Sequence, residues 1–149
     1  MTRVVKRILK FEVPKSHYAA DALIFWCFDD RFSHLLKAFI DARGFKRVDV
    51  VKVAGGAKGL FEPGTEQDYL LDQMDKSLKL HHPPEIILMV HDECGAYGKT
   101  FEKSGEMTTF LGGQLDIMAD LVRKHLAKLN QPDIKITKYI ADFEGVLEV

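Results

Sequence analysis

The sequence predicts an α/β fold, a three-layer sandwich in which helices flank a mainly parallel central β-sheet. Nearly continuous apolar runs alternate with amphipathic stretches of helical length, which is the pattern of strands buried on both faces. Polar side chains able to do chemistry follow directly after three of these runs, where the carboxyl ends of parallel strands form ligand sites. At 149 residues and 46% hydrophobic composition, the chain is expected to be a single domain of residues 1–149.

Four apolar stretches predict the strands. They cover residues 22–28, 48–56, 85–91 and 133–142. The third, EIILMVH, is the most hydrophobic of the four. The last is expected to direct Ile134 and Ile136 inward, together with Tyr139 or Ile140. Residues 1–20 fit neither the helical nor the strand period, and we expect them to form a short N-terminal arm.

Three stretches with apolar residues at helical spacing predict helices over residues 31–44, 65–80 and 108–129. Gly44 is the expected stop of the first helix. Thr65 is predicted to cap the second helix, with Asp68 completing a capping box, and the sequence HHPP to end it. The residues predicted to face inward are Leu35, Leu36, Phe39 and Ile40 in the first helix, Leu70, Leu71, Met74 and Leu78 in the second, and Leu111, Leu115, Met118, Val122, Leu126 and Leu129 in the third.

Charge and composition narrow the classes of partner. The 21 basic and 22 acidic residues give a net charge of -1, which provides no electrostatic footprint for nucleic acid or an anionic membrane. We therefore expect a small-molecule partner. No signal peptide and no run of 18 apolar residues is present, so a cytoplasmic protein is expected. In that reducing compartment the two cysteines, Cys27 and Cys94, are available for metal binding or catalysis.

Three candidate metal ligands come at the ends of predicted strands. Cys27 ends the first strand, His91 ends the third, and Cys94 follows three residues later in a turn. Two thiolates and an imidazole suit zinc, and three protein ligands leave a fourth position for water or substrate, as in catalytic sites. Each cysteine alone is more often a small buried hydrophobe. A second hypothesis is a thiol redox protein with a Cys27–Cys94 bond and no metal.

The motifs around these ligands resemble those of the β-class carbonic anhydrases. Cys27-Phe-Asp29-Asp-Arg31 is similar to the family pattern Cys-x-Asp-x-Arg, and His91-Asp-Glu-Cys94-Gly is similar to His-x-x-Cys-Gly. The stretch VDVVKVAGG resembles the strand and loop between those motifs, and YIADFEGVLEV resembles the family's closing segment. The resemblance extends over residues 20 to 149.

The resemblance implies a specific chemistry for these residues. It assigns Cys27, His91 and Cys94 as ligands of Zn²⁺, and Asp29 and Arg31 as the catalytic pair. Arg31 holds Asp29 off the metal in the open form of the family, and the aspartate becomes the fourth ligand in the closed form. The implied reaction is reversible hydration of carbon dioxide to bicarbonate and a proton by metal-bound hydroxide. The family's smallest working unit is a homodimer, so at least a homodimer is expected.

Three departures from the family pattern keep alternatives open. Val53 stands where the family commonly has asparagine, and Asp30 stands where it commonly has serine, with the potential to compete with Asp29 for Arg31. The glutamine that many members place before the first cysteine is missing. The alternatives are hydrolysis of carbonyl sulfide or carbon disulfide on the same zinc, and a non-catalytic zinc-binding homologue.

Other residues are candidates for supporting roles. Gly55 and Gly56 are expected in the substrate pocket, because they follow the second strand at the same sheet edge. The aromatic side chains near the first motif suit either an apolar entrance or the core; they are Phe25, Trp26, Phe28 and Phe32. The titratable candidates for proton export are His17, His34, His81 and His82. Tyr18 or His17 is the polar group nearest to the position of the missing glutamine.

Overall fold

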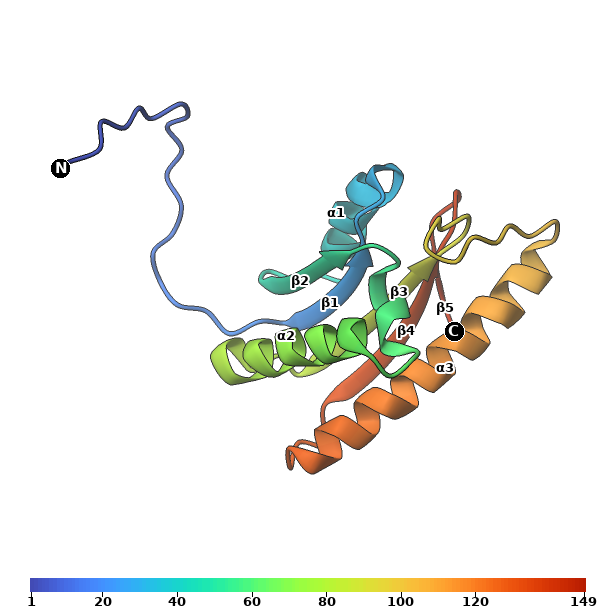
Figure 1. Ribbon diagram of the computed structural model, residues 1–149. Coiled ribbons are helices and arrows are strands. Elements are labelled where there is room, and N and C mark those ends of the chain that lie inside the picture. The colour runs from blue at the N-terminus through green and yellow to red at the C-terminus, as the bar shows by residue number, and fades with distance from the viewer.

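The computed structural model describes residues 1–149, and a five-stranded sheet of order β2-β1-β3-β4-β5 lies at its centre (Figure 1). The strands are β1 (Ala22–Cys27), β2 (Val48–Val53), β3 (Glu85–His91), β4 (Lys135–Ala141) and β5 (Val146–Glu148). The first four run parallel to one another, and β5 pairs antiparallel with β4. The predicted α/β fold with a mainly parallel sheet is confirmed.

Helices cover both faces of this sheet (Figure 1). They are α1 (Ser33–Ala42), α2 (Thr65–His81) and α3 (Ser104–Lys128), with short 3-10 helices η1 (Asp30–Phe32) and η2 (Gly56–Leu60). Apolar residues of α2 and α3 share one core cluster, whereas those of α1 belong to a second cluster on the opposite face. The arrangement is the predicted three-layer sandwich.

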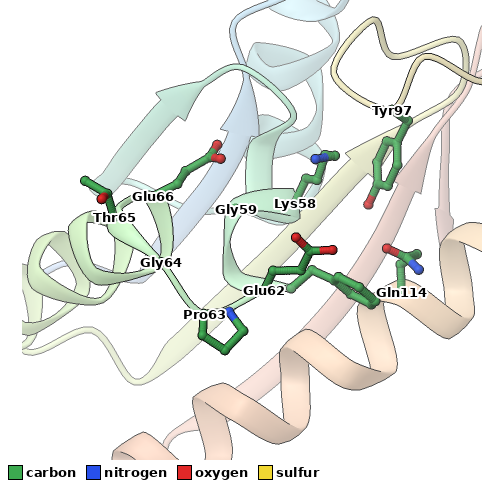
Figure 2. A pocket seen from close by; sticks show the side chains of 10 residues that line it. Lys58, Gly59, Glu62, Pro63, Gly64, Thr65, Glu66, Tyr97 and Gln114 are labelled. Atoms are coloured by element: carbon green, nitrogen blue, oxygen red, sulfur yellow. The ribbon is translucent and has the colours of Figure 1, made fainter.

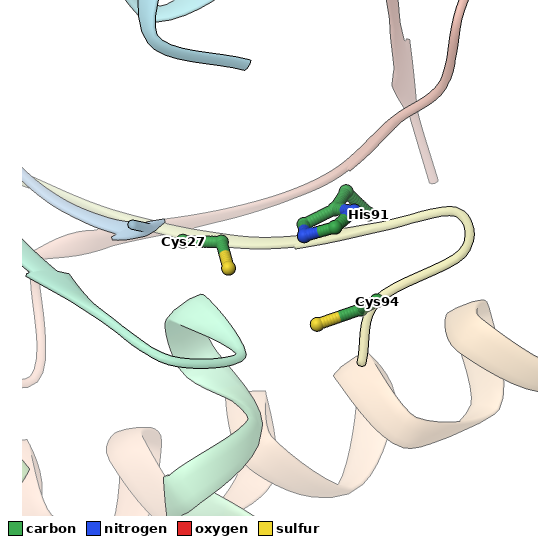
Figure 3. A group of neighbouring side chains, drawn as sticks. All are labelled: Cys27, His91 and Cys94. Carbon is green, nitrogen blue, oxygen red and sulfur yellow. The ribbon is translucent and has the colours of Figure 1, made fainter. Parts of the chain in front are cut away.

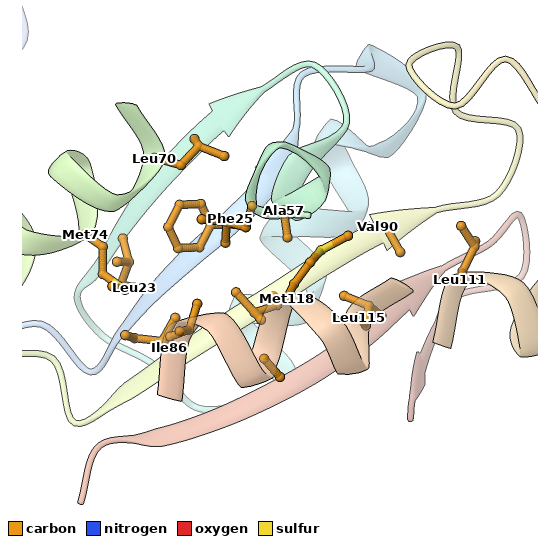
Figure 4. Packing of buried hydrophobic residues seen from close by; sticks show 14 of the residues in the cluster. Leu23, Phe25, Ala57, Leu70, Met74, Ile86, Val90, Leu111, Leu115 and Met118 are labelled. Carbon is orange, nitrogen blue, oxygen red and sulfur yellow. The ribbon is translucent and has the colours of Figure 1, made fainter. Parts of the chain in front are cut away.

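The two central strands explain why the apolar runs are continuous. Every residue of β1 and β3 is buried, because successive side chains of a strand point to opposite faces and both faces are covered. In β1, Leu23 and Phe25 pack in the α2–α3 cluster, which Figure 4 shows, while Ile24 and Trp26 pack in the α1 cluster.

The strand order places the carboxyl ends of β1 and β3 at the centre of one sheet edge. From β1 the chain moves to β2 on one side, and it then returns to form β3 on the other side of β1. In open α/β sheets, the crevice outside the carboxyl ends of the strands at such a switch point is the usual ligand site. The last residues of these two strands are Cys27 and His91.

Three predicted details of the elements are wrong. Gly64, not Thr65, is the cap residue of α2, and no side chain caps this helix. Leu129 lies beyond the end of α3 and is 38% exposed, because the helix stops one residue before it. The last predicted strand is followed by a further one, β5, whose three residues are too few for an alternating pattern to be recognised.

Residues 1–21 belong to no helix or strand, and they extend away from the sheet as a long segment (Figure 1). The apolar side chains of its outer part, such as Val4 and Ile8, are exposed, whereas Ala20 at its base is buried. The base of this segment is attached to the sheet, since the Tyr18 hydroxyl donates to Asp49 Oδ1 at 2.6 Å. No helix of the structure combines the length and the apolar composition needed to cross a bilayer.

Candidate metal centre

The three predicted ligands meet at the carboxyl ends of the central strands β1 and β3. Cys27 and His91 end these neighbouring parallel strands, and Cys94 lies in the turn that follows β3. Their ligand atoms all lie within 4.8 Å of one another, and Figure 3 shows the two sulfur atoms and the imidazole facing a common point. All three residues are buried. Parallel pairing thus brings together side chains that are far apart in the sequence.

The hydrogen bonds of His91 fit a metal ligand. Its Nδ1 lies 2.6 Å from the carbonyl oxygen of Asp92, and because a carbonyl only accepts, Nδ1 carries the proton. Nε2 then presents a lone pair, and it is buried with no hydrogen-bond partner. A buried polar atom without a partner is costly unless something binds it. Two sulfurs and one unprotonated imidazole nitrogen are a donor set suited to Zn²⁺.

The thiols of Cys27 and Cys94 have pKa values shifted in opposite directions. A hydrogen bond from the Cys94 thiol lowers the pKa of Cys27, and hydrogen bonds from the backbone N–H groups of Asp29 and Gly55 lower it further. The Gly55 amide nitrogen lies 3.3 Å from Cys27 Sγ. The same interaction with Cys27, together with burial, raises the pKa of Cys94. The site therefore stabilises a thiolate on Cys27, the form that binds a metal.

Asp29 and Arg31 form a two-point ion pair beside the ligands. Arg31 Nη2 lies 2.7 Å from Asp29 Oδ2, and Nε lies 3.1 Å from Oδ1. Hydrogen bonds from the Arg31 side chain lower the pKa of Asp29 to about 2. Asp29 Oδ2 is also 3.9 Å from Nε2 of His91. The carboxylate thus faces the arginine while remaining next to the ligand atoms.

A second acidic residue contacts Arg31, and it is Glu93. Asp30, which precedes Arg31 in the sequence, was the acid expected to compete for it. Arg31 Nη2 donates to the Glu93 carbonyl oxygen at 3.3 Å, and Nη1 is 3.6 Å from its carboxylate. Asp30 makes no ion pair with Arg31. Glu93 has φ 51°, a left-handed conformation that is unusual for a residue with a side chain. Its place between His91 and Cys94 was the only sequence signal.

Two aromatic rings complete the surroundings of Arg31. The Phe32 ring lies 4.3 Å from the His91 ring, centroid to centroid. Phe143, from the turn between β4 and β5, places its ring 5.3 Å from the Arg31 guanidinium carbon. Phe32 was among the aromatic candidates, whereas Phe143 was not singled out, because its position near Arg31 depends on how β4 and β5 are placed.

A cavity of about 300 Å³ opens at the ligands. Its lining residues are Cys27, Phe28, Asp29, Ala54, Gly55, His91, Cys94, Gly95 and Ala96. Apart from the three ligands, Asp29 is the only lining residue with a polar side chain. The cavity thus combines a donor set for a metal, one carboxylate and otherwise apolar or glycine walls.

The other predicted pocket and entrance residues are placed as follows. Gly56 is not among the residues that line the cavity. It is packed so tightly that a Cβ atom would lie 2.4 Å from the Met89 carbonyl oxygen. Phe25 and Trp26 belong to the core, and Phe28 alone of the four aromatic candidates lines the cavity.

Two of the histidine candidates for proton export, His81 and His82, lie at the end of the sheet opposite to this cavity. His81 ends α2, its Nδ1 is 2.8 Å from Asp49 Oδ2, and His82 follows it. Both precede β3, so they lie at the amino end of the strand whose carboxyl end carries His91. Tyr18 binds Asp49 at that same end. His34, near the start of α1, is exposed and lines no part of the cavity.

A larger cavity lies elsewhere in the molecule. It has a volume of about 470 Å³ and contains none of the three ligands (Figure 2). Lys58, Glu62, Glu66 and Gln114 contribute polar groups of mixed charge, and the buried hydroxyl of Tyr97 has no hydrogen-bond partner. Size alone therefore does not identify the metal centre, which is found from its donor atoms.

No family model matches the sequence, and no curated protein matches it. Solved structures do match the fold. Carbonic anhydrase from Streptococcus mutans is 22% identical, with a TM-score of 0.52 over 94% of this chain and 87% of that one. β-Carbonic anhydrase isoform I from Trichomonas vaginalis is 19% identical, with a TM-score of 0.54 over 92% of this chain and 87% of that one.

A third similar structure is reported for two tetrameric β-carbonic anhydrases from Sordaria macrospora, with 12% identity and a TM-score of 0.50 over 89% of this chain and 81% of that one. At these identities the likeness concerns the fold, and the ligand cluster is this chain's own. The chain has the fold of the β-carbonic anhydrases, and its cluster of Cys27, His91 and Cys94 fits the zinc motif that the sequence resembles.

Proposed function

We propose that this chain is a zinc enzyme that catalyses the reversible hydration of carbon dioxide to bicarbonate and a proton. The observation that carries the proposal is the convergence of Cys27, His91 and Cys94 beside a carboxylate that is paired with Arg31. A structural zinc site has four protein ligands, whereas three ligands that open into a cavity are typical of catalytic sites.

Each residue of the site has a distinct role in the proposed reaction. Cys27, His91 and Cys94 would hold a zinc ion, which would supply a nucleophile derived from water at neutral pH. Asp29, whose pKa hydrogen bonds from Arg31 lower to about 2, is ionised at that pH, and its carboxylate would accept a hydrogen bond from that nucleophile and orient it. Arg31 keeps the carboxylate from taking the ligand position. The apolar walls formed by Phe28, Ala54 and Ala96 suit an uncharged, apolar substrate.

We also infer that the working unit is a homo-oligomer. The likeness to structures described as tetrameric β-carbonic anhydrases supports this inference. Exposed apolar residues of the N-terminal segment, such as Val4, Ile8 and Phe11, have no packing partner within the chain. Mass measurement in solution tests the inference, and a monomer at micromolar concentration contradicts it.

Stopped-flow hydration of carbon dioxide by the zinc-loaded chain between pH 6.5 and 9 tests the proposed reaction. Asp29→Asn is expected to lower kcat/KM by about ten- to hundredfold. Asp30→Asn is the matched control, because it removes an adjacent exposed carboxylate that makes no ion pair with Arg31. The control is expected to retain activity within about twofold.

The same protein distinguishes the alternatives. Full zinc content without hydration at any pH, but with hydrolysis of carbonyl sulfide or carbon disulfide, replaces the substrate and keeps the site. Zinc without turnover of any of the three compounds indicates a non-catalytic homologue. Either result overturns the proposed reaction.

A further inference from the structure

Phe143 occupies an unusual place for an apolar side chain. It is 56% exposed, and it belongs to neither core cluster. Its ring nevertheless lies 5.3 Å from the guanidinium carbon of Arg31 and 5.5 Å from the Phe32 ring. Since burial in the core does not account for this position, the contact with the cation is the interaction to consider.

The turn that carries Phe143 is held by hydrogen bonds of the Asp142 side chain and backbone. Asp142 Oδ1 accepts the N–H groups of Glu144 at 2.8 Å and Gly145 at 2.9 Å, and the Asp142 N–H donates to the Gly145 carbonyl at 2.9 Å. At the base of the turn, the Asp92 N–H donates to the Ala141 carbonyl at 2.9 Å. These bonds connect the turn to the segment directly after His91, so the placement of the ring is coupled to the metal centre.

Arg31 is therefore held from several sides. Arg31 Nε and Nη2 donate hydrogen bonds to the Asp29 carboxylate, and Nη2 also donates to the Glu93 carbonyl oxygen. Phe143 and Phe32 supply ring contacts, with guanidinium carbon to centroid distances of 5.3 and 5.8 Å. An aromatic ring within about 6 Å of a guanidinium attracts the cation. Hydrogen-bond acceptors orient the guanidinium, and the rings limit its movement away from them.

We propose that Phe143 is a positioning residue: its ring holds Arg31 against Asp29 and so keeps the carboxylate paired with the arginine and out of the ligand position. The catalytic consequence rests on the proposed function, because Asp29 must stay off the ligand position for turnover. The effect on Arg31 itself requires no reaction. A leucine at position 143 preserves an apolar side chain but removes the attraction to the cation, whereas a tyrosine preserves it.

The proton on Nε of Arg31 reports this effect directly. It donates to both Asp29 carboxylate oxygens, at 3.1 and 3.2 Å, so its exchange with water requires the pair to open. In the zinc-loaded full chain, the exchange rate is measured by ¹H–¹⁵N NMR, with the signal identified by its loss in Arg31→Lys. Phe143→Leu is expected to increase the rate roughly two- to fivefold, the factor that corresponds to an exposed cation–π contact.

Two further variants serve as controls for the Phe143→Leu measurement. Phe143→Tyr keeps an aromatic ring and is expected to have the same exchange rate as the unaltered chain. Phe11→Leu makes the same chemical change at an exposed phenylalanine of the N-terminal segment and is expected to leave the rate unchanged. In carbon dioxide hydration, Phe143→Leu is expected to lower kcat while KM stays the same, because the substrate walls are not altered.

An Arg31 exchange rate that is the same in Phe143→Leu and the unaltered chain overturns the proposal. An equal increase in Phe11→Leu overturns it as well, because the effect is then not specific to the contact. If the unaltered chain shows no hydration activity, the proposed function fails, yet the exchange rates still decide whether Phe143 holds Arg31. The two failures are therefore distinguishable.

Discussion

The guanidinium of Arg31 binds the carboxylate of Asp29 at two points, with Nη2 2.7 Å from Oδ2 and Nε 3.1 Å from Oδ1. A planar guanidinium offers both donors in a fixed geometry, whereas a lysine ammonium is a single point charge. The direction of the Asp29 carboxylate therefore depends on arginine itself, and not only on a positive charge at position 31.

Arg31→Lys is accordingly expected to lower kcat/KM for carbon dioxide hydration by about ten- to hundredfold while zinc content is retained. The measurement is stopped-flow hydration with metal analysis of the same sample. Arg123→Lys serves as the control, because Arg123 pairs with Asp120 on the exposed surface of α3. Equal activity of Arg31→Lys and the unaltered chain contradicts the assigned role.

The Phe32 ring packs against the imidazole of His91, with the two centroids 4.3 Å apart, and is expected to fix the orientation of that imidazole. Phe32→Leu is expected to weaken zinc binding by about tenfold, because groups that fix a ligand's orientation contribute to metal affinity. Competition with a chromophoric chelator measures the affinity. Phe101→Leu, which alters a ring packed on Phe110 instead, is expected to bind zinc normally. Unchanged affinity in Phe32→Leu refutes the orienting role.

Asp49 is expected to make stability depend on pH. Burial alone raises the pKa of Asp49, but hydrogen bonds from Ser77, Tyr18 and His81 outweigh it, so its folded pKa is below the ordinary value. A lowered folded pKa gives stabilisation that is present above about pH 4 and is lost as the pH falls through the folded pKa. The ionised carboxylate is the form that these donors stabilise.

Urea unfolding of the zinc-free chain at pH 7 and pH 3 measures this dependence without a contribution from metal loss. Asp49→Asn is expected to lower the free energy of unfolding at pH 7 by about 1–3 kcal/mol, and by less at pH 3. A difference between the two proteins that is the same at both pH values contradicts the prediction.

Two glycines are expected to respond in opposite directions to alanine. Gly56 has φ 61°, and a Cβ atom there would lie 2.4 Å from the Met89 carbonyl oxygen, so Gly56→Ala is expected to cost at least about 1–3 kcal/mol. Gly113 lies in α3 with nothing within 4 Å of a Cβ position, so Gly113→Ala is expected to stabilise by about 0.5–1 kcal/mol. Urea unfolding compares both, and a stabilised Gly56→Ala refutes the packing account.

The ligand cluster could be predicted from the sequence because it depends on a general rule of parallel sheets. Cys27 and His91 each end an apolar run, and neighbouring parallel strands bring their carboxyl ends together. The same rule places His81 and His82 at the opposite end, because they come before β3 and not after it. The sequence order alone therefore predicts that His81 and His82 lie far from the metal centre.

The rest of the site depends on local geometry that the sequence does not display. Glu93 contacts Arg31 because its backbone is left-handed, a conformation that glycine, and to a lesser degree asparagine, would signal. Phe143 reaches Arg31 only because β5 turns back along β4. The Thr65 capping motif was misleading, since the helix begins at Thr65 and Gly64 takes the cap position.

The most direct test of the central claim is X-ray absorption at the zinc edge of the chain as purified, with zinc content determined on the same sample. One zinc per chain is predicted, with two sulfur neighbours at about 2.3 Å and nitrogen or oxygen neighbours at about 2.0 Å. Cys94→Ser is expected to reduce the sulfur count to one. A chain that binds no zinc, or a zinc surrounded by four sulfur atoms, contradicts the assignment of Cys27, His91 and Cys94 as the three protein ligands of an open site.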